Sequence, residues 1–225
     1  MISHEHKCIM VHIQRCAGTS MEEKILGYDV WESPRLVNGI PEMYTKHANA
    51  SQLKALYSEY WDEYFKFSFI RNPWERMVSM GKSFPGHYNV KINDGKLDVS
   101  GYKKKFGFPL TVEYDRRFSQ RFLGGGNVSP RNPDKHSEGT VYENILDEKI
   151  DFIGRFENLQ EDFAYVANQI GFADGNLNIH NENKKQKYGG HDFENYYTEE
   201  CVKEVETIYK KDILKYKYGF SVKIT

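Results

Sequence analysis

The sequence has little cysteine and no cysteine pair spaced to bind a metal. Its 225 residues include three cysteines, Cys8, Cys16 and Cys201, which are far apart and form no CxxC pair. An odd number of widely spaced cysteines is typical of reduced thiols, and it argues against a disulfide framework or a zinc site. The cysteines therefore give no reason to expect a metal centre.

Long hydrophobic runs and an export signal are also absent. No apolar stretch approaches the ~20 residues that a membrane-spanning helix needs. The first six residues lack the basic and then apolar layout of a signal peptide. Two triplets that fit the glycosylation pattern, at residues 49–51 and 127–129, are attributed to chance because no export signal accompanies them. We expect a cytoplasmic protein without a membrane span.

The net charge is low. The 31 Lys and Arg residues nearly balance the 32 Asp and Glu residues, which leaves a formal net charge of −1. This balance argues against a general nucleic-acid coat protein but permits a local basic pocket. Aromatic residues make up 15% of the chain, and a disordered chain would not carry so many rings. We expect a folded globular protein with no nucleic-acid partner.

Short apolar runs alternate with helical patterns along the chain. Strands are predicted at residues 7–13, 65–70 and 150–156, the first of them buried on both faces, and a helical pattern follows each strand. This order predicts an α/β fold in three layers around a central parallel sheet. Residues 82–140 are rich in Gly, Asn, Lys and Pro, with one convincing helix at about 111–123. We expect a single domain over residues 1–225, with an insertion at about 82–140 on the substrate side.

The turn after the first predicted strand has the parts of a phosphate cradle. Residues 14–20, QRCAGTS, offer consecutive backbone N–H groups, one guanidinium and two hydroxyls ahead of a helix. Thr19 and Ser20 are candidates for the N-cap of that helix. The GxxxxGK[ST] spacing of a triphosphatase P-loop is absent. An ordinary tight turn remains the alternative interpretation.

The turn after the second predicted strand is a second candidate anion site. Arg71 directly follows the strand, Asn72 is placed to cap the next helix, and Ser79 lies one to two turns along that helix. Arg71 and Ser79 can bind one phosphate through a bidentate guanidinium and a hydroxyl. In the alternative interpretation, Arg71 and Arg76 pair with Glu75 or another surface acid.

The two turns together resemble motifs of the PAPS-dependent sulfotransferases. HIQRCAGTS at residues 12–20 resembles the 5′-phosphosulfate loop of that family, HIPKTAGTS, and FSFIRNPWERMVS at 67–79 resembles its 3′-phosphate motif. GRFENLQEDF at 154–163 and IYKKDILKYKYGF at 208–220 are also similar to the family. The resemblance is to the branch with the heparan 2-O- and chondroitin-type carbohydrate enzymes and many bacterial relatives. It implies a P-loop NTPase-like sulfotransferase fold, and it fades through residues 82–140.

The resemblance implies that the sulfonate donor is 3′-phosphoadenosine 5′-phosphosulfate (PAPS), with no metal required. Arg71 and Ser79 would hold its 3′-phosphate. Lys184 and Lys185 lie in a late polar loop that often closes over the donor in this fold. The residues that would hold the 5′-phosphosulfate are Arg15, Cys16, Ala17, Gly18, Thr19 and Ser20.

Two positions of the first loop depart from the family pattern. Arg15 stands where the family has a lysine that neutralises charge on the bridging oxygen as the sulfonate leaves. Arginine keeps the positive charge but is larger and not interchangeable with lysine. Cys16 replaces the usual threonine, and we expect it to be a small packing residue. We expect donor binding to survive both changes.

His47 is the candidate general base. It lies between the two donor motifs, just before a predicted helix, where the relatives have their catalytic histidine. A histidine with a pKa of about 6.5 is suited to accept a proton at neutral pH. A helix-capping or exposed histidine is the alternative interpretation. We expect His12 to be structural, and Glu22 or Glu23 is the reserve base because other sulfotransferase branches use glutamate.

The resemblance therefore implies transfer of a sulfonate group from PAPS to a hydroxyl of a small molecule or glycan, with a carbohydrate favoured. Gln120 is a weak match to an acceptor-side glutamine of the relatives. Two alternatives stay open: a P-loop-type nucleotide kinase or triphosphatase, and a catalytically inactive protein that binds PAPS or its product. The sequence identifies neither the acceptor nor the oligomeric state. Basic residues of the insertion, interleaved with aromatic rings, would suit an anionic or sugar acceptor unless they form a solvated face: Lys103, Lys104, Lys105, Arg116, Arg117, Arg121 and Arg131.

Overall fold

The structure is a computed structural model, and it describes residues 1–33, 35–37, 40–83, 89–102, 139–177 and 191–220. The chain divides into two compact units. The first unit comprises residues 1–70 and 145–186, and the second comprises residues 71–144 and 187–225. Each unit is described by itself. That the whole chain is one domain with an insertion stays a prediction.

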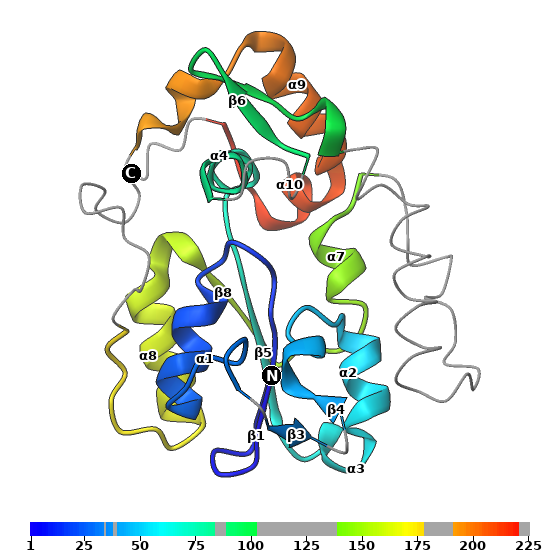
Figure 1. Ribbon diagram of the computed structural model, residues 1–225, viewed down its shortest axis with the longest axis vertical. Coiled ribbons are helices and arrows are strands. Elements are labelled where there is room, and N and C mark those ends of the chain that lie inside the picture. The colour runs from blue at the N-terminus through cyan, green and yellow to red at the C-terminus, as the bar shows by residue number, and fades with distance from the viewer. Residues whose placement is uncertain (34, 38–39, 84–88, 103–138, 178–190, 221–225) are drawn as a thin grey trace. The chain divides into compact units, whose positions relative to one another are not determined.

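A four-stranded sheet forms the centre of the first unit (Figure 1). Its order is β1-β2-β5-β8, in which β2, β5 and β8 run parallel and β1 is antiparallel to β2. The strands are Ile2–Ser3 (β1), Cys8–Val11 (β2), Phe65–Ile70 (β5) and Phe152–Arg155 (β8). The three predicted strands are therefore confirmed. The two residues of β1 are too few to give a sequence pattern.

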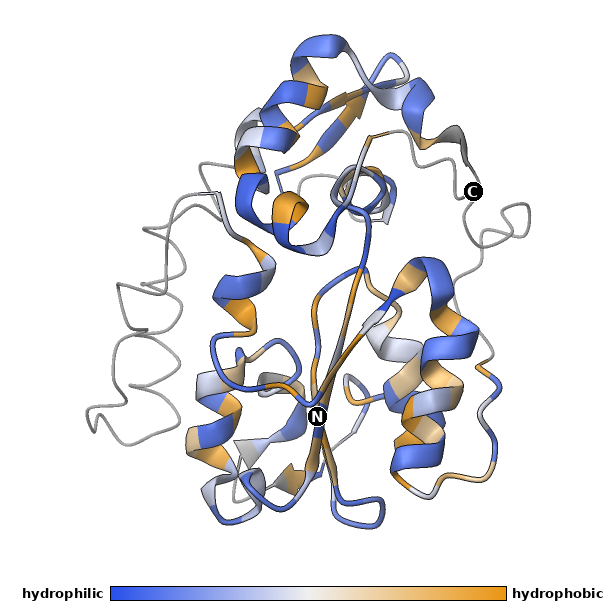
Figure 2. Cartoon of the chain, turned by 180° about the vertical axis from the view of Figure 1, so that it is seen from behind, coloured by the Kyte–Doolittle hydropathy of each residue, from blue (hydrophilic) through white to orange (hydrophobic). Residues whose placement is uncertain are grey.

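Helices cover both faces of this sheet, as the opposite views in Figures 1 and 2 show. Helices α1 (Gly18–Leu26) and α8 (Leu159–Gln169) lie on one side, and α2 (Ala50–Leu56) and α3 (Ser58–Trp61) lie on the other. All four residues of β2 are buried, and the strands are largely coloured as hydrophobic in Figure 2. The prediction of an α/β fold with parallel strands at its centre is confirmed. Smaller elements of the unit are β3 (Leu36–Val37), β4 (Ile40–Pro41), η1 (Glu42–Tyr44) and η2 (Phe156–Asn158).

A capping box starts helix α2 just after His47. The Asn49 side chain accepts a hydrogen bond from the Gln52 N–H at 3.0 Å, and the Asn49 N–H donates to Gln52 Oε1 at 2.9 Å. Buried Asp147 accepts from the Ser51 N–H at 2.8 Å and from the Ser51 hydroxyl at 2.7 Å. These bonds satisfy N–H groups at the helix start that lack partners within the helix. They therefore fix the backbone that follows the candidate base.

The second unit is built around helix α4 (Pro73–Ser83). The Asn72 side chain accepts from the Trp74 N–H at 3.1 Å, which confirms Asn72 as the predicted cap. Strands β6 (Lys91–Asn93) and β7 (Lys96–Asp98) form a hairpin that the sequence analysis missed, although Asp94-Gly95 is a strong turn signal. The remaining elements are α7 (Tyr142–Ile145), which begins in this unit, η3 (His191–Tyr196), α9 (Glu199–Ile208) and α10 (Lys210–Tyr216).

Several predicted features lie outside the described residues. They include the helix expected at 111–123, most of the insertion at 82–140, and Lys184 and Lys185. Within the described part of the chain, no helix has both the length and the apolar character to cross a bilayer.

Substitution of Gly154 tests the packing of the central sheet. An ideal Cβ built at Gly154 in β8 would lie 2.5 Å from the Phe69 ring, whereas one at Gly219 would meet nothing within 4 Å. We expect Gly154→Ala to lower the free energy of unfolding by about 1–3 kcal/mol because the core would be overpacked. The matched control Gly219→Ala should leave it nearly unchanged. Urea denaturation of both variants measures the difference, and equal stabilities would contradict the packing described here.

Candidate functional site

The loop between β2 and α1 has the backbone geometry of an anion-binding turn. Arg15 has a φ of 67° and Ala17 a φ of 64°, whereas Cys16 between them does not have a positive φ. Such alternation turns successive N–H groups toward one concavity. The left-handed region costs a residue with a side chain roughly 1–2 kcal/mol. Strain of this kind is common at ligand-binding sites.

Helix α1 begins earlier than predicted. Its N-cap is Ala17, and Gly18 is the first helical residue. The prediction that Thr19 or Ser20 caps the helix is wrong, because the left-handed turn at Ala17 places both hydroxyls inside the first helical turn. Ala17 has no side-chain oxygen and makes no capping bond. The first N–H groups of the helix therefore lack a bond from the N-cap side chain.

The side chains of the loop differ in how deeply they are buried. Arg15, Ala17 and Thr19 are partly exposed, whereas Cys16 and Ser20 are buried. The Cys16 thiol lies 3.7 Å from the carbonyl oxygen of Gln14. A buried thiol that faces the backbone fits the packing role expected for Cys16. The exposed loop face therefore presents a guanidinium and one hydroxyl.

His12 explains why position 18 is glycine. A Cβ on Gly18 would lie 2.3 Å from the His12 imidazole, so only glycine lets the helix start so close to that ring. Nδ1 of His12 lies 3.0 Å from Oε1 of Glu22. His12 is 5% exposed. It has the structural position expected of it.

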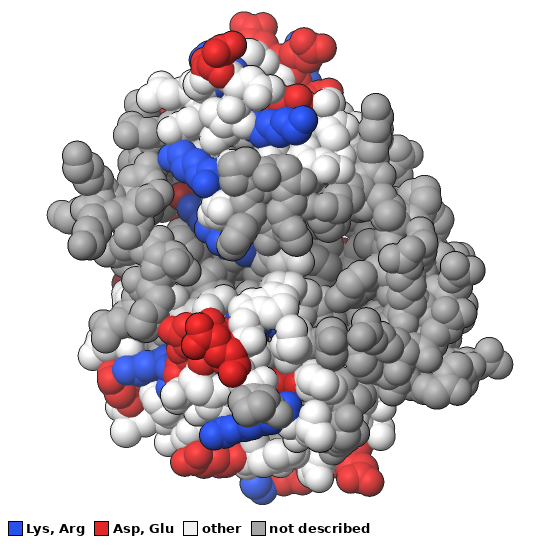
Figure 3. Space-filling model, in the orientation of Figure 1, with Lys and Arg blue, Asp and Glu red and all other residues white. Residues whose placement is uncertain are grey.

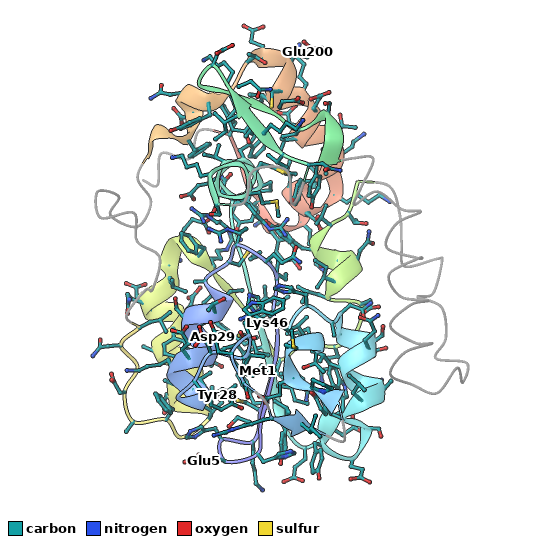
Figure 4. The ribbon with its side chains drawn as sticks, in the orientation of Figure 1. Met1, Glu5, Tyr28, Asp29, Lys46 and Glu200 are labelled. Atoms are coloured by element: carbon teal, nitrogen blue, oxygen red, sulfur yellow. The ribbon has the colours of Figure 1, made fainter. Side chains whose placement is uncertain are left out.

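Glu22 lies at the centre of a buried group of charges in the first unit. It is fully buried, and its Oε2 forms an ion pair with Nζ of Lys46 at 2.8 Å. Lys46 is 1% exposed and also lies 3.5 Å from Oδ1 of Asp29. Lys46 and Asp29 are close neighbours in Figure 4. Burial alone would raise the pKa of Glu22, but His12 and Lys46 lower it to about 2. Glu22 is fully buried and already paired with His12 and Lys46, so it is poorly placed to serve as the reserve base.

The structure brings His47 next to the loop. Its ring packs edge to face on His12, with ring centroids 4.8 Å apart, and His12 in turn packs on Gly18. Asn49 caps α2, so the helix-capping interpretation of His47 does not apply. Burial, reinforced by the neighbouring His12, lowers the pKa of His47 to about 3. The imidazole is therefore neutral at neutral pH, which is the form that can accept a proton.

Two further neighbours of His47 were not predicted from the sequence. The Trp31 ring lies 5.7 Å from the His47 ring, and Nζ of Lys46 lies 5.3 Å from the Trp31 ring. Only its position next to His47 in the chain could have indicated that Lys46 lies near the candidate base. Trp31 lies in no motif, so nothing in the sequence marked it.

In the second unit, three partly exposed residues lie just before α4 and within it. Arg71, Glu75 and Ser79 are spaced by four residues, whereas positions 72–74, 76–78 and 80–81 are buried. Nη2 of Arg71 donates to Oε1 of Glu75 at 2.8 Å, so the ion pair considered as an alternative does exist. Buried Arg76 donates instead to the Tyr209 hydroxyl, which indicates a structural role. The segment thus carries an arginine and a serine with a carboxylate between them.

The described surface carries charges of both signs. On the face drawn in Figure 3, the described Lys and Arg side chains lie among Asp and Glu. The described residues include no group of three or more His, Cys, Asp or Glu placed to hold a metal ion. Gln120 and the basic residues of the insertion lie outside the described ranges.

Comparison with known proteins gives one match. Residues 1–83 match the model of a family described as the sulfotransferase family. This range contains the loop at 15–20, His47, and Arg71 with Ser79. The resemblance to sulfotransferases is confirmed at the level of the family, while the carbohydrate and bacterial branch stays a prediction. No curated protein and no solved structure matches the chain.

The low pKa of His47 makes stability depend on pH. The pKa is about 3 in the folded protein and 6.5 in its ordinary state, so the unfolded chain binds more protons below pH 6.5. The free energy of unfolding should fall with falling pH, by up to about 1.4 kcal/mol per pH unit. His47→Gln removes this proton uptake and should flatten the dependence. Urea unfolding of both proteins from about pH 7 to about pH 4 tests the point. Identical slopes would show that His47 titrates normally.

Proposed function

We propose that this chain, whose residues 1–83 match the sulfotransferase family, transfers a sulfonate group from PAPS to an acceptor hydroxyl. The observation that carries the proposal lies within the first unit. The strained loop at residues 15–17 meets the start of α1, where His12 packs on Gly18 and His47 packs on His12. An anion-binding turn and a neutral imidazole are thereby brought together. These are the two parts that sulfonate transfer needs first.

The loop residues fit a phosphosulfate group. Cys16, Ala17 and Gly18 would contribute backbone N–H groups, and Thr19 would contribute its partly exposed hydroxyl, whereas the side chain of Ser20 is buried. Arg15, which is partly exposed, would neutralise the charge that develops on the bridging oxygen of the donor. Its planar fork can contact two oxygens, where a lysine would place a single point charge.

We propose that Arg71 and Ser79 bind the 3′-phosphate of the donor. Arg71 lies just before α4 and Ser79 lies within it, both are partly exposed, and a guanidinium with a hydroxyl is a suitable ligand pair for phosphate. Glu75 already pairs with Arg71 at 2.8 Å, so a bound phosphate must either share the Arg71 guanidinium with this carboxylate or displace the carboxylate. Lys184 and Lys185 are proposed as additional donor contacts on the basis of the sequence alone.

His47 would act as the general base. The acceptor oxygen attacks sulfur as the bond between sulfur and the bridging oxygen breaks, and the acceptor proton passes to the imidazole of His47. Bound PAPS supplies the sulfonate group, and the product is adenosine 3′,5′-bisphosphate (PAP). A carbohydrate hydroxyl is the proposed acceptor, and no metal is assigned a role.

Of the two alternatives, a nucleotide kinase or triphosphatase is disfavoured by the missing GK[ST] spacing in the first loop. The second alternative, a protein that binds PAPS without turnover, is separated from the proposal by the turnover experiment below.

Binding of PAP tests the assignment of α4. Arg71→Ala should weaken PAP binding by about 2–4 kcal/mol, because a phosphate charge is left without its partner. Glu75→Gln should tighten it, because the competing carboxylate loses its charge. Isothermal titration calorimetry with PAP, and with adenosine 5′-phosphate as a control that lacks the 3′-phosphate, measures both effects. The assignment fails if Arg71→Ala binds PAP as tightly as the unmodified protein.

Turnover tests the role of His47. His47→Ala should lower sulfonate transfer from labelled PAPS by about 10²–10⁴-fold, which is the usual contribution of a general base. PAP affinity should change little, since the donor ligands remain. A panel of glycans, phenols and lipids provides the acceptors. Tight PAP binding with no transfer to any acceptor, unaffected by His47→Ala, would favour the inactive binding protein.

A further inference from the structure

Trp31 is an exposed aromatic residue in an unusual place. It is 48% exposed, whereas the other two tryptophans, Trp61 and Trp74, are 4% and 1% exposed. Single exposed apolar side chains are common and need no explanation by themselves. Tyr165, which is similarly exposed, packs against the Phe152 ring of the sheet. Trp31 differs because its ring packs against the candidate base, His47.

The indole is held in place. Its ring centroid lies 5.7 Å from that of His47, at an interplanar angle of 61°. Nζ of Lys46 lies 5.3 Å from the indole, and that ammonium is anchored on buried Glu22 at 2.8 Å. The backbone N–H of Trp31 donates to Oδ1 of Asp29 at 2.9 Å. These contacts connect Trp31 to the buried charges near His47, so the position of its ring is fixed by the packing around it.

The surroundings of the indole favour a ligand with many hydroxyls and no negative charge. The Asp29 side chain is 27% exposed, and Glu32 is exposed in the same turn. Carboxylates accept hydrogen bonds from hydroxyls but repel an anionic ligand. The Lys46 ammonium is already paired with Glu22 and Asp29, so it attracts an anion only weakly. An aromatic face beside carboxylates matches a pyranose, whose ring C–H groups pack on the indole while its hydroxyls reach the acids.

We propose that Trp31 forms an acceptor subsite on which the apolar face of an uncharged pyranose stacks, so that a ring hydroxyl is presented to His47. The assignment of the acceptor hydroxyl rests on the proposed function, because His47 acts as a base only in the proposed sulfonate transfer. The subsite lies within the first unit and needs none of the basic residues of the insertion. The acceptor proposed for this subsite is a neutral sugar, whereas the basic residues of the insertion suggested an anionic or sugar acceptor.

Indole resonances can report this subsite directly. Three tryptophans give three side-chain N–H signals in a ¹⁵N-labelled protein, and the Trp31 signal is the one lost in Trp31→Phe. The protein is first saturated with PAP and then titrated separately with methyl β-D-glucopyranoside, methyl β-D-galactopyranoside and phenol. We expect at least one glycoside to shift the Trp31 signal saturably, while the signals of buried Trp61 and Trp74 stay in place.

Two variants separate stacking from general apolar contact. Trp31→Leu keeps apolar bulk but removes the ring, and it should weaken glycoside binding about tenfold when binding is followed through the His47 ring protons. Leu36→Ala, at another exposed apolar residue of the same segment, should change nothing. PAP affinity should be the same in the unmodified protein, Trp31→Leu and Leu36→Ala.

The outcomes distinguish this inference from the proposed function. If the unmodified protein does not bind PAP, the proposed function fails, and the subsite fails with it. If PAP binds but neither glycoside moves the Trp31 signal, the subsite alone is rejected. It is also rejected if phenol binds more tightly than both glycosides, which would indicate a planar aromatic acceptor, or if Trp31→Leu binds the glycoside normally.

Discussion

The buried carboxylate of Glu22 is the constraint on which the candidate site depends. It faces His12, which follows β2, and Lys46, which precedes His47, while Glu22 itself lies in the second turn of α1. A charge buried without partners costs several kcal/mol, so each of these groups requires the others. One carboxylate thereby fixes the end of a strand, the start of a helix and the segment that carries the candidate base.

The same constraint accounts for the strained loop. Arg15 and Ala17 hold left-handed conformations that a chain does not adopt without compensation. Compensation comes from the fixed ends of the loop. His12 is held by Glu22, and the helix start must then pass so close to His12 that only glycine fits at position 18. Under the proposed function, a loop whose ends are fixed in this way would need little reorganisation to bind an anion.

The sequence predicts local features of this molecule better than side-chain contacts. Apolar runs predicted β2, β5 and β8, and Asn72 was recognisable as a helix start because capping depends on a few neighbouring residues. The start of α1 was misplaced, since it depends on a left-handed alanine that no propensity favours. The contacts of Trp31 with His47 and Lys46 could not be predicted. They result from tertiary packing and leave no periodic pattern in the chain.

Under the proposed function, the low pKa of His47 links proton transfer to the presence of the donor. In the free protein, burial and the neighbouring His12 favour the neutral imidazole, which makes it a weak base. The negative charges of a donor on the adjacent loop act in the opposite direction, because they stabilise the imidazolium. A donor bound at the adjacent loop would therefore raise the pKa of His47 and make it a stronger base.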